Sequence, residues 1–298
     1  MDDGRLKRHE TGFLQAASLP SPDELRAYYA ERYYQTGQGN YRKTYPQAER
    51  DYFDLKIALK AFLLDRLRGD AGPGSFLDVG CGEGFALSWF QRQGWKVEGL
   101  DHSIAGIVAM HPDLVPHVRT GDLFALLDEK AGEGRHYDAV WLTHVLEHVS
   151  DPLSLLERLR GLVKPDGVLI VTVPNDGSAY QEMLLEEKFI SRRFWVALPD
   201  HLAYFDGESL RRAAQQTGWA CREMVSDFPI DFFLLHEGSN YVEDSTKGPA
   251  AHRARIAMEL FLGKQGHAAA NEFYGALARV GLGRSLTCFL TPKPQGNP

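Results

Sequence analysis

The stretch FLDVGCGEG, residues 76–84, is the most informative part of this sequence. An apolar segment ends in three alternating glycines, Gly80, Gly82 and Gly84, and a helical pattern begins near Phe85. Glycine allows a sharp turn and lets a ligand approach the backbone, and the first turn of a helix offers free N–H donors. The stretch therefore predicts a strand, a ligand-binding loop and a helix in succession.

The spacing and charges around this loop indicate the kind of ligand. A dinucleotide-binding loop reads G-x-G-x-x-G, whereas this loop reads G-x-G-x-G and contains no basic residue for a pyrophosphate. Asp78 precedes the glycines and suits a cationic or amine-bearing ligand. Asp101 ends the next apolar segment, where a carboxylate can accept both hydroxyls of a ribose. Asp122 follows a third segment and could accept from an adenine amino group, with Leu123 against the ring.

Short apolar segments alternate with helical patterns along most of the chain. Such alternation predicts an α/β fold with a mostly parallel sheet and helices on both faces. Helices are predicted at 51–68, 151–164 and 208–217. Strands are predicted at 75–80, 96–101, 117–122, 137–143, 167–173, 220–228 and 285–291.

Three segments lie outside this alternation. Residues 1–50 are polar and rich in tyrosine (Tyr28, Tyr29, Tyr33, Tyr34, Tyr41 and Tyr45), and residues 176–205 and 229–284 are insertions. We expect one domain at 51–298 with both insertions as caps, and an N-terminal lid at 1–50. All three could cover the carboxyl ends of the strands, where ligands bind in open α/β sheets. They could instead complete the core or contact a second copy of the chain in a homodimer.

Composition excludes several classes of protein. The chain has 298 residues, with 33 Lys and Arg against 40 Asp and Glu and a net charge of −7, so a general DNA-binding surface is not expected. No apolar run reaches the roughly 20 residues of a membrane span, and the first residues lack the apolar core of a signal peptide. Three scattered cysteines, Cys81, Cys221 and Cys288, indicate neither a disulfide framework nor a zinc cluster. These features predict a cytoplasmic enzyme or binding protein.

Five segments together resemble the class I S-adenosylmethionine (SAM)-dependent methyltransferases. They are LDVGCGEG (77–84), GLDHS (99–103), GDLF (121–124), YDAVWLTHVLEHVSDP (137–152) and LVKPDGVLIVTVPN (162–175). The resemblance implies a Rossmann-like seven-stranded sheet, a loop at 78–84 that holds the methionine part of SAM, ribose binding by Asp101 and adenine binding by Asp122. The expected cofactor residues are Asp78, Gly80, Cys81, Gly82, Gly84, Asp101, His102, Asp122, Leu123 and Thr143.

A cluster of histidines and a glutamate follows the fourth predicted strand. His144, Glu147 and His148 would project to one side if this turn were helical, and His201 is a fourth candidate. The cluster resembles that of ubiquinone-pathway O-methyltransferases and small-RNA 2′-O-methyltransferases, where an E-x-x-E-H segment and a later histidine hold a divalent cation. Here His144 replaces the first glutamate. The alternatives are a divalent metal on all four residues, a histidine general base among His144, His148 and His201, and a structural role.

The insertions contain the candidates for acceptor binding. Asn175 and Asp176 follow the fifth predicted strand, Arg192 and Arg193 lie beside aromatic residues, and Tyr204 lies near His201. Arginine beside aromatic rings suits an anionic or sugar-like acceptor. Arg253 and Arg255 are two residues apart and cannot share a helix face, so we expect one of them, Arg253, to reach the acceptor.

The insertions as a whole resemble those of bacterial methyltransferases that act on sugars of surface polysaccharides or secondary metabolites. The sequence therefore predicts a SAM-dependent O-methyltransferase for a small polar acceptor, such as a sugar or glycan, with metal assistance as one form of the reaction. Two alternatives remain. One is methyl transfer to nitrogen, carbon or an RNA 2′-hydroxyl, and the other is a non-catalytic binding module.

Overall fold

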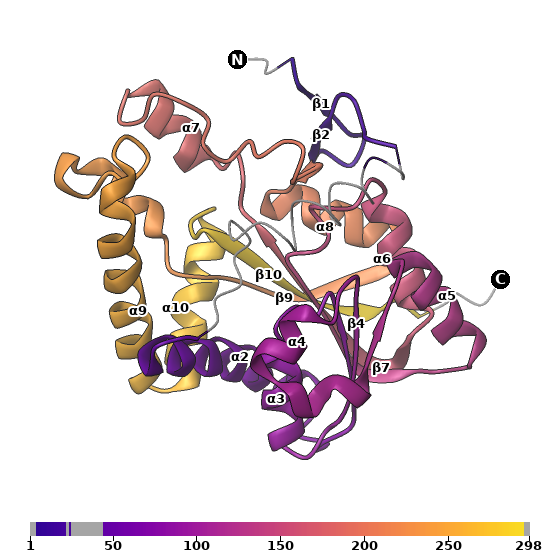
Figure 1. Ribbon diagram of the computed structural model, residues 1–298. Helices are drawn as coiled ribbons and strands as arrows, with labels where there is room; N and C mark the ends of the chain where they lie inside the picture. Colours follow the sequence, from indigo (N-terminus) through magenta and orange to yellow (C-terminus); the bar gives the residue numbers. More distant parts are fainter. Residues whose placement is uncertain (1–3, 22–23, 25–43, 295–298) are drawn as a thin grey trace.

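The computed structural model describes residues 4–21, 24 and 44–294, and a single sheet of seven strands lies at its centre (Figure 1). The strand order is β5-β4-β3-β6-β7-β10-β9. β10 is antiparallel to both of its neighbours, and the other pairs are parallel. The strands are β3 (Ser75–Val79), β4 (Lys96–Asp101), β5 (Val118–Thr120), β6 (Tyr137–Thr143), β7 (Val163–Pro174), β9 (Trp219–Ser226) and β10 (Ser285–Pro292). The predicted Rossmann-like mostly parallel sheet is thus confirmed.

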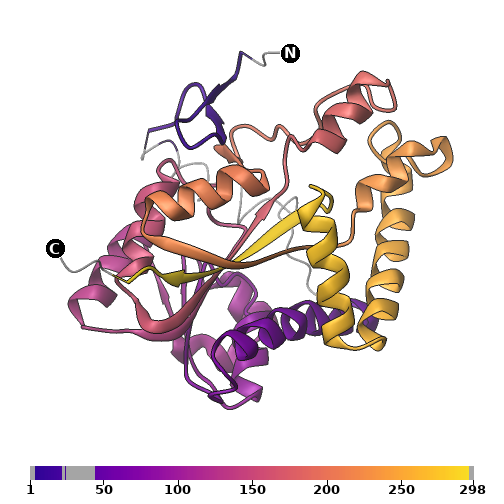
Figure 2. The same ribbon diagram turned by 180° about the vertical axis from the view of Figure 1, so that it is seen from behind.

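Helices cover both faces of the sheet, as the two views in Figures 1 and 2 show. One face packs against α2 (Gln47–Leu67), α3 (Phe85–Arg92), α4 (Ala105–Met110) and α10 (His267–Arg279). The other packs against α5 (Leu123–Gly132), α6 (Pro152–Arg160) and α8 (Gly207–Gln216). Each layer buries an apolar cluster, which is what holds a doubly wound fold together. No helix among the described residues has the length and apolar character needed to cross a bilayer.

The face of the sheet toward α2 changes character along its strands. Trp141, Ile170 and Phe289 lie side by side on β6, β7 and β10 and belong to the core. One pleat further toward the carboxyl ends of the parallel strands, the corresponding residues are Thr143, Thr172 and Thr287. Because alternate residues of a strand point to the same face, the threonines continue the apolar row on the α2 side. The sheet therefore passes from core to polar surface within one pleat.

β7 begins earlier than the sequence predicted, at Val163 instead of residue 167. The pairing with β6 shifts register here, from Tyr137 opposite Val163 to Ala139 opposite Val168. The extra residues of this irregularity include Pro165, which cannot donate a ladder hydrogen bond and is tolerated at such a position. Pro165 and Asp166, which lie between the predicted helix at 151–164 and the predicted strand at 167–173, are thus part of the strand.

The N-terminal residues form a small separate sheet. β1 (Leu6–Arg8) and β2 (Leu14–Ala16) pair as a hairpin, and β2 also pairs with β8 (Ala203–Tyr204). Phe13 is buried against Phe205, with ring centroids 4.7 Å apart. The described part of the predicted lid therefore pairs with and packs against the segment around residue 203. Tyr28, Tyr29, Tyr33, Tyr34 and Tyr41 lie outside the described residues.

The two insertions, 176–205 and 229–284, pack against different parts of the molecule. The first carries α7 (Ala179–Glu186) and β8, and it packs with the start of the second in a separate apolar cluster. The second contains three 3-10 turns, η3 (Ile230–Leu235), η4 (Glu237–Ser239) and η5 (Ser245–Lys247), followed by α9 (Gly248–Lys264) and α10. Ala270 and Tyr274 of α10 belong to the core beside α2. Part of the predicted cap at 229–284 is therefore a core layer, which was the alternative interpretation.

A close contact between two backbones holds the glycine-rich loop against α4. A Cβ atom added at Gly106 would lie 2.5 Å from the carbonyl oxygen of Gly82. We expect Gly106→Ala to lower the free energy of unfolding by about 1–3 kcal/mol, because either backbone must move. Gly132→Ala, at the end of α5 with open space around it, is the matched control and should change stability by less than about 0.5 kcal/mol. Equal denaturation midpoints for the two variants would contradict this packing argument.

Candidate functional site

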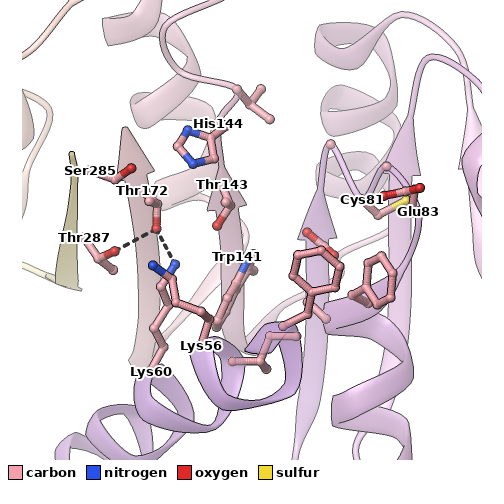
Figure 3. A pocket seen from close by; sticks show the side chains of 18 of the residues that line it. Lys56, Lys60, Cys81, Glu83, Trp141, Thr143, His144, Thr172, Ser285 and Thr287 are labelled. Atoms are coloured by element: carbon pink, nitrogen blue, oxygen red, sulfur yellow. Dashed lines mark hydrogen bonds between the residues drawn. The ribbon is translucent and has the colours of Figure 1, made fainter. Parts of the chain in front are cut away.

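A cavity of about 1040 Å³ lies at the carboxyl ends of the parallel strands. Residues of the glycine-rich loop line one side, and the other side, called the far wall below, is lined by α2, α9, α10, β6, β7, β9 and β10. Figure 3 shows this span, from Cys81 and Glu83 on one side to Ser285 and Thr287 on the other. Pockets for one small ligand usually measure about 300–1,000 Å³. The cavity is therefore large enough for a cofactor and a second small molecule.

Asp101 organises the loop through both carboxylate oxygens. Oδ2 accepts a hydrogen bond from the backbone N–H of Gly82 at 2.8 Å, and Oδ1 accepts one from Ser103 at 3.0 Å. Gly80 has a φ of 77°, and a Cβ atom there would collide with Val145. Glycine is needed here for the left-handed backbone as well as for space. The loops after β3 and β4 are thus joined into one unit.

The second acid at this end of the cavity, Asp78, is buried. Burial and the neighbouring Asp101 carboxylate raise the pKa of Asp78 to about 8, although Lys60 opposes the shift. At neutral pH this carboxyl is therefore mostly protonated, and a cationic ligand group beside it would favour its ionised form. Burial also raises the pKa of the Cys81 thiol, so Cys81 fills space in the loop and is a poor nucleophile.

All ten residues predicted to bind the cofactor line this cavity. Asp122 caps α5 by accepting from the N–H of Ala125 at 3.0 Å, and its side chain is exposed at the rim. Leu123 is buried beside it, and His102 is exposed. Thr143 ends β6, and its hydroxyl is buried without a hydrogen-bond partner among the described residues. The structure thus brings the set together, while the individual ligand contacts stay predictions.

The histidine cluster differs from the predicted arrangement. The turn after β6 is not helical, because His144 adopts a φ of 54°. His144 is exposed and its Nδ1 lies 3.1 Å from Glu147 Oε1, whereas possible metal-donor atoms of Glu147, His148 and His201 lie within 4.8 Å of one another. The backbone carbonyl of Glu147 accepts from Leu202 N–H at 2.7 Å, which brings His201 to this place. The four-residue set of the sequence becomes a group of three without His144.

His148 is held as a cation. Its Nδ1 lies 2.8 Å from the carbonyl oxygen of Asp200 and 3.4 Å from the Asp200 carboxylate. Burial by itself would lower the pKa of His148, but the contacts with Asp200 and the charge of Glu147 raise it to about 9. An imidazole that is protonated at neutral pH is a poor general base.

The predicted acceptor-binding residues lie away from the cavity lining. The Asn175 amide donates to the carbonyls of Gly281 and Gly283, and the buried Asp176 carboxylate pairs with Arg284 at 2.5 Å. Such bonds tie the end of β7 to the start of β10. Asn175 and Asp176 therefore have structural partners in place of an acceptor hydroxyl.

The basic and tyrosine candidates are also engaged elsewhere. Arg192 donates to the carbonyl of Val242, Arg193 pairs with Glu182 at 2.9 Å, and the Tyr204 hydroxyl donates to the carbonyl of His201. Arg253 is exposed and does not line the cavity, whereas Arg255 does. Arg255 therefore lies on the inward side of α9, while contact of Arg253 with an acceptor stays a prediction.

Sequence reasoning missed a polar group on the far wall. Lys56 lies 3.3 Å from Asp227 and 3.5 Å from Glu259, and Lys60 donates to the hydroxyl of Thr172 at 2.8 Å (Figure 3 labels both lysines). The available signal was two lysines four residues apart, and therefore on one side, in the helix predicted at 51–68. Lysine is almost never buried without a partner, so this spacing indicated an internal polar site.

A known family matches the chain over the same region. The model of a methyltransferase domain matches residues 48–224. A mitochondrial ubiquinone biosynthesis O-methyltransferase of Arabidopsis thaliana is 32% identical over 130 residues, which are 42% of this chain and 40% of the relative. One from Shewanella halifaxensis is 27% identical over 173 residues, 56% of this chain and 72% of the relative. The match thus covers two fifths of the Arabidopsis relative and less than three quarters of the Shewanella relative.

A solved structure has the same fold. The Burkholderia thailandensis 1,6-didemethyltoxoflavin-N1-methyltransferase, with bound 1,6-didemethyltoxoflavin and S-adenosylhomocysteine, is 16% identical with a TM-score of 0.53. The match covers 97% of this chain and 99% of that one. The likeness defines a Rossmann-like fold, with the cavity at the carboxyl ends of its parallel strands. The chain belongs to the methyltransferase domain family and is a class I SAM-dependent methyltransferase.

The double contact of Asp101 with the loop makes it the sharpest test of the cofactor end. We expect Asp101→Ala to lower the affinity for S-adenosylhomocysteine by at least about tenfold, the worth of one charge-assisted hydrogen bond. Isothermal titration calorimetry measures the loss. The matched control is Asp166→Ala, an exposed aspartate near the start of β7 at the other end of the sheet. Unchanged affinity in the folded Asp101 variant would refute the assignment.

Proposed function

We propose that this enzyme transfers the methyl group of SAM to a hydroxyl oxygen of a small acceptor bound in the same cavity. The observation that carries the proposal is the division of the cavity into two ends. The predicted cofactor residues gather around the glycine-rich loop, and a second set of polar groups on α2, β7 and β10 faces the remaining space. The two relatives described above are named O-methyltransferases, which supports oxygen as the atom that is methylated.

When bound, SAM supplies a methyl group that is already strongly electrophilic because it is attached to a sulfonium. The task left to the chain is alignment of the acceptor oxygen with that methyl group and removal of a proton. Asp78 is suited to the amine of the methionine part, and Asp101 holds the loop in shape through Gly82 and Ser103. Apolar side chains of α2, such as Ile57, restrict water around the acceptor.

The character of the far wall favours an acceptor with a flat apolar face. Its lining includes aromatic and aliphatic side chains, namely Tyr52, Phe53, Ile57, Trp141, Val225 and Tyr274. The sugar acceptor predicted from the sequence depended on Arg192 and Arg193, whose guanidinium groups have protein partners. We therefore infer a hydroxylated ring compound as the acceptor, with a sugar as the competing class.

Glu147, His148 and His201 offer donor atoms of the kind that a divalent cation takes, and the cation would have to replace the proton of His148. Glu147 Oε2 is buried without a hydrogen-bond partner in the described part of the chain, and His201 Nδ1 lies 3.4 Å from the Asp176 carboxylate. A bound cation would acidify a hydroxyl that coordinates it. Of the three residues, however, His148 alone lines the cavity. We infer that a cation here would hold the turn after β6 to the segment around residue 201, away from the acceptor.

A mass-spectrometric screen tests the proposed reaction. We expect SAM and a set of hydroxylated aromatic compounds to yield a product heavier by one CH₂, with fragmentation that locates the methyl group on oxygen. Nucleotide sugars and free glycans form the second arm of the screen. The denatured enzyme is the blank. Methylation of sugars only would overturn the ring acceptor, and methylation on nitrogen would overturn the O-methyltransferase proposal.

Chelation tests the position of the cation. We expect EDTA to leave the rate of methyl transfer unchanged, because Glu147 and His201 do not line the cavity. Binding of a cation would instead be seen as a lower Tm after EDTA, since a ligand of the native state stabilises it. Loss of turnover that is restored by adding back Mg²⁺, Mn²⁺ or Zn²⁺ would show that the metal acts on the acceptor.

A further inference from the structure

Three threonines form a polar row across the far wall of the cavity. Thr143 pairs with Thr172 in the register of β6 and β7, and Thr172 pairs with Thr287 in that of β7 and β10. Val79, the last residue of β3, is opposite Leu142, so the row begins at the level of Gly80. It therefore leads from the cofactor loop into the part of the cavity that no predicted cofactor residue lines.

Two of the three threonine hydroxyls in this row have hydrogen-bond partners, and the third has none among the described residues. The hydroxyls of Thr172 and Thr287 lie 2.9 Å apart, and Lys60 Nζ donates to that of Thr172 at 2.8 Å. Among the described residues, the buried hydroxyl of Thr143 has no partner. A buried polar atom without a partner costs free energy, so Thr143 is an open position for a hydrogen bond from a ligand next to Lys60.

The Lys60 amine, whose hydrogen bond goes to the Thr172 hydroxyl, belongs to a side chain that also lines the cavity. Its Nζ is 5.0 Å from the centre of the Trp141 ring, and the residue lines the cavity. No ion pair to a carboxylate within 4.0 Å is found for Lys60 in the part of the chain that the structure describes, whereas Lys56 one turn earlier has two, to Asp227 and Glu259. In Figure 3 both amines reach up from α2 toward Thr172.

The charges that face Lys60 come from four elements. They are Lys56 on the same helix, Asp227 after β9, Glu259 on α9 and Asp78 on β3. Burial lowers the pKa of Lys60 most, Lys56 lowers it further, and the three carboxyl groups raise it, with the result that it lies at about 7. A cationic cofactor in the adjoining loop would act in the same direction as Lys56. Lys60 is thus neutral over a large part of the physiological range, which a lysine that removes protons requires.

We propose that Lys60 is the catalytic residue that removes the proton of the acceptor hydroxyl, and that Thr143 and Thr172 position that hydroxyl beside it. The inference rests on the proposed function. The O–H proton passes to the lone pair of Nζ, which becomes an ammonium. The electron pair of the broken O–H bond stays on the oxygen, and an oxygen lone pair forms the bond to the methyl carbon. The methyl–sulfur bond breaks, and its electrons stay on sulfur as the neutral thioether of S-adenosylhomocysteine.

The strength of this base narrows the acceptor class. An amine with a pKa near 7 is matched to a phenolic or enolic hydroxyl, whose pKa is about 10 in the case of tyrosine. A sugar hydroxyl is far less acidic and would need a stronger base or a metal. The base and the apolar lining thus favour the same acceptor, a hydroxyl on an aromatic or enolic ring.

The state of Lys60 can be measured without an acceptor. Reductive methylation with ¹³C-formaldehyde gives each lysine an NMR signal, and the signal lost in Lys60→Arg identifies Lys60. Titration of the labelled protein should show a midpoint near 7 for the signal assigned to Lys60. A Lys60 midpoint above about 9.5, close to the ordinary value of about 10.4 for lysine, overturns the proposal whatever the acceptor is.

Steady-state kinetics test proton removal by Lys60, with the phenolic compound that is methylated in the screen as the acceptor. Lys60→Met and Lys60→Arg should each lower kcat by about a hundredfold or more and keep the affinity for S-adenosylhomocysteine. The rate of the wild-type enzyme should rise as pH increases through about 7, and this limb should be absent in both variants. Lys60→Arg keeps a cation and guards against misfolding of the methionine variant. Lys96→Met is the matched control.

Three other results of these experiments would overturn the role of Lys60 or the proposed function. Loss of S-adenosylhomocysteine affinity in parallel with kcat overturns the proposal, because Lys60 would then bind the cofactor. A fully active Lys60→Met variant that forms O-methylated product overturns this inference alone. A wild-type enzyme that methylates nitrogen overturns the proposed function as well.

Discussion

The carboxylate of Asp101 joins the loops after β3 and β4, and the geometry of the cofactor end depends on it. Two neighbouring parallel strands end at the same edge of the sheet, so the backbone N–H groups beyond them would otherwise have no acceptor. Asp101 accepts from Gly82 and from Ser103. The same residue therefore forms the loop and stands at the cavity, which couples folding of this edge to the chemistry expected there.

The two ends of the cavity solve opposite electrostatic problems. At the loop, buried Asp78 and Asp101 create a surplus of acid that suits a cationic cofactor. On the far wall, Lys56 pairs with Asp227 and Glu259, and Lys60 lies beside threonine hydroxyls. Burial acts on both acid and amine by disfavouring the charged form. An acid that is partly protonated and an amine that is partly neutral can thus lie in one cavity without strong mutual neutralisation.

Sequence reasoning reached the sheet and the cofactor end because their signals are local. The strand, the glycines and the acids at the ends of the next strands follow one another in regular order, and all ten expected cofactor residues line the cavity. The acceptor end depends on tertiary contacts that no local pattern contains. Arg193 has its partner in Glu182, and Asn175 is occupied by carbonyls about a hundred residues away in sequence. The turn at His144 also departs from the helical spacing because of its left-handed backbone.

The order of these parts along the chain separates the two halves of the cavity. Residues 75–145 supply the cofactor loop and most of its neighbours, whereas the opposite wall comes from α2 before them and from the segment between β9 and β10 after them. α9 can therefore change in composition on its cavity side without altering the register of the parallel strands, whereas α10 is held in the core. A family with this layout can acquire new acceptors by changing one helix near its C-terminus while the cofactor half is inherited intact.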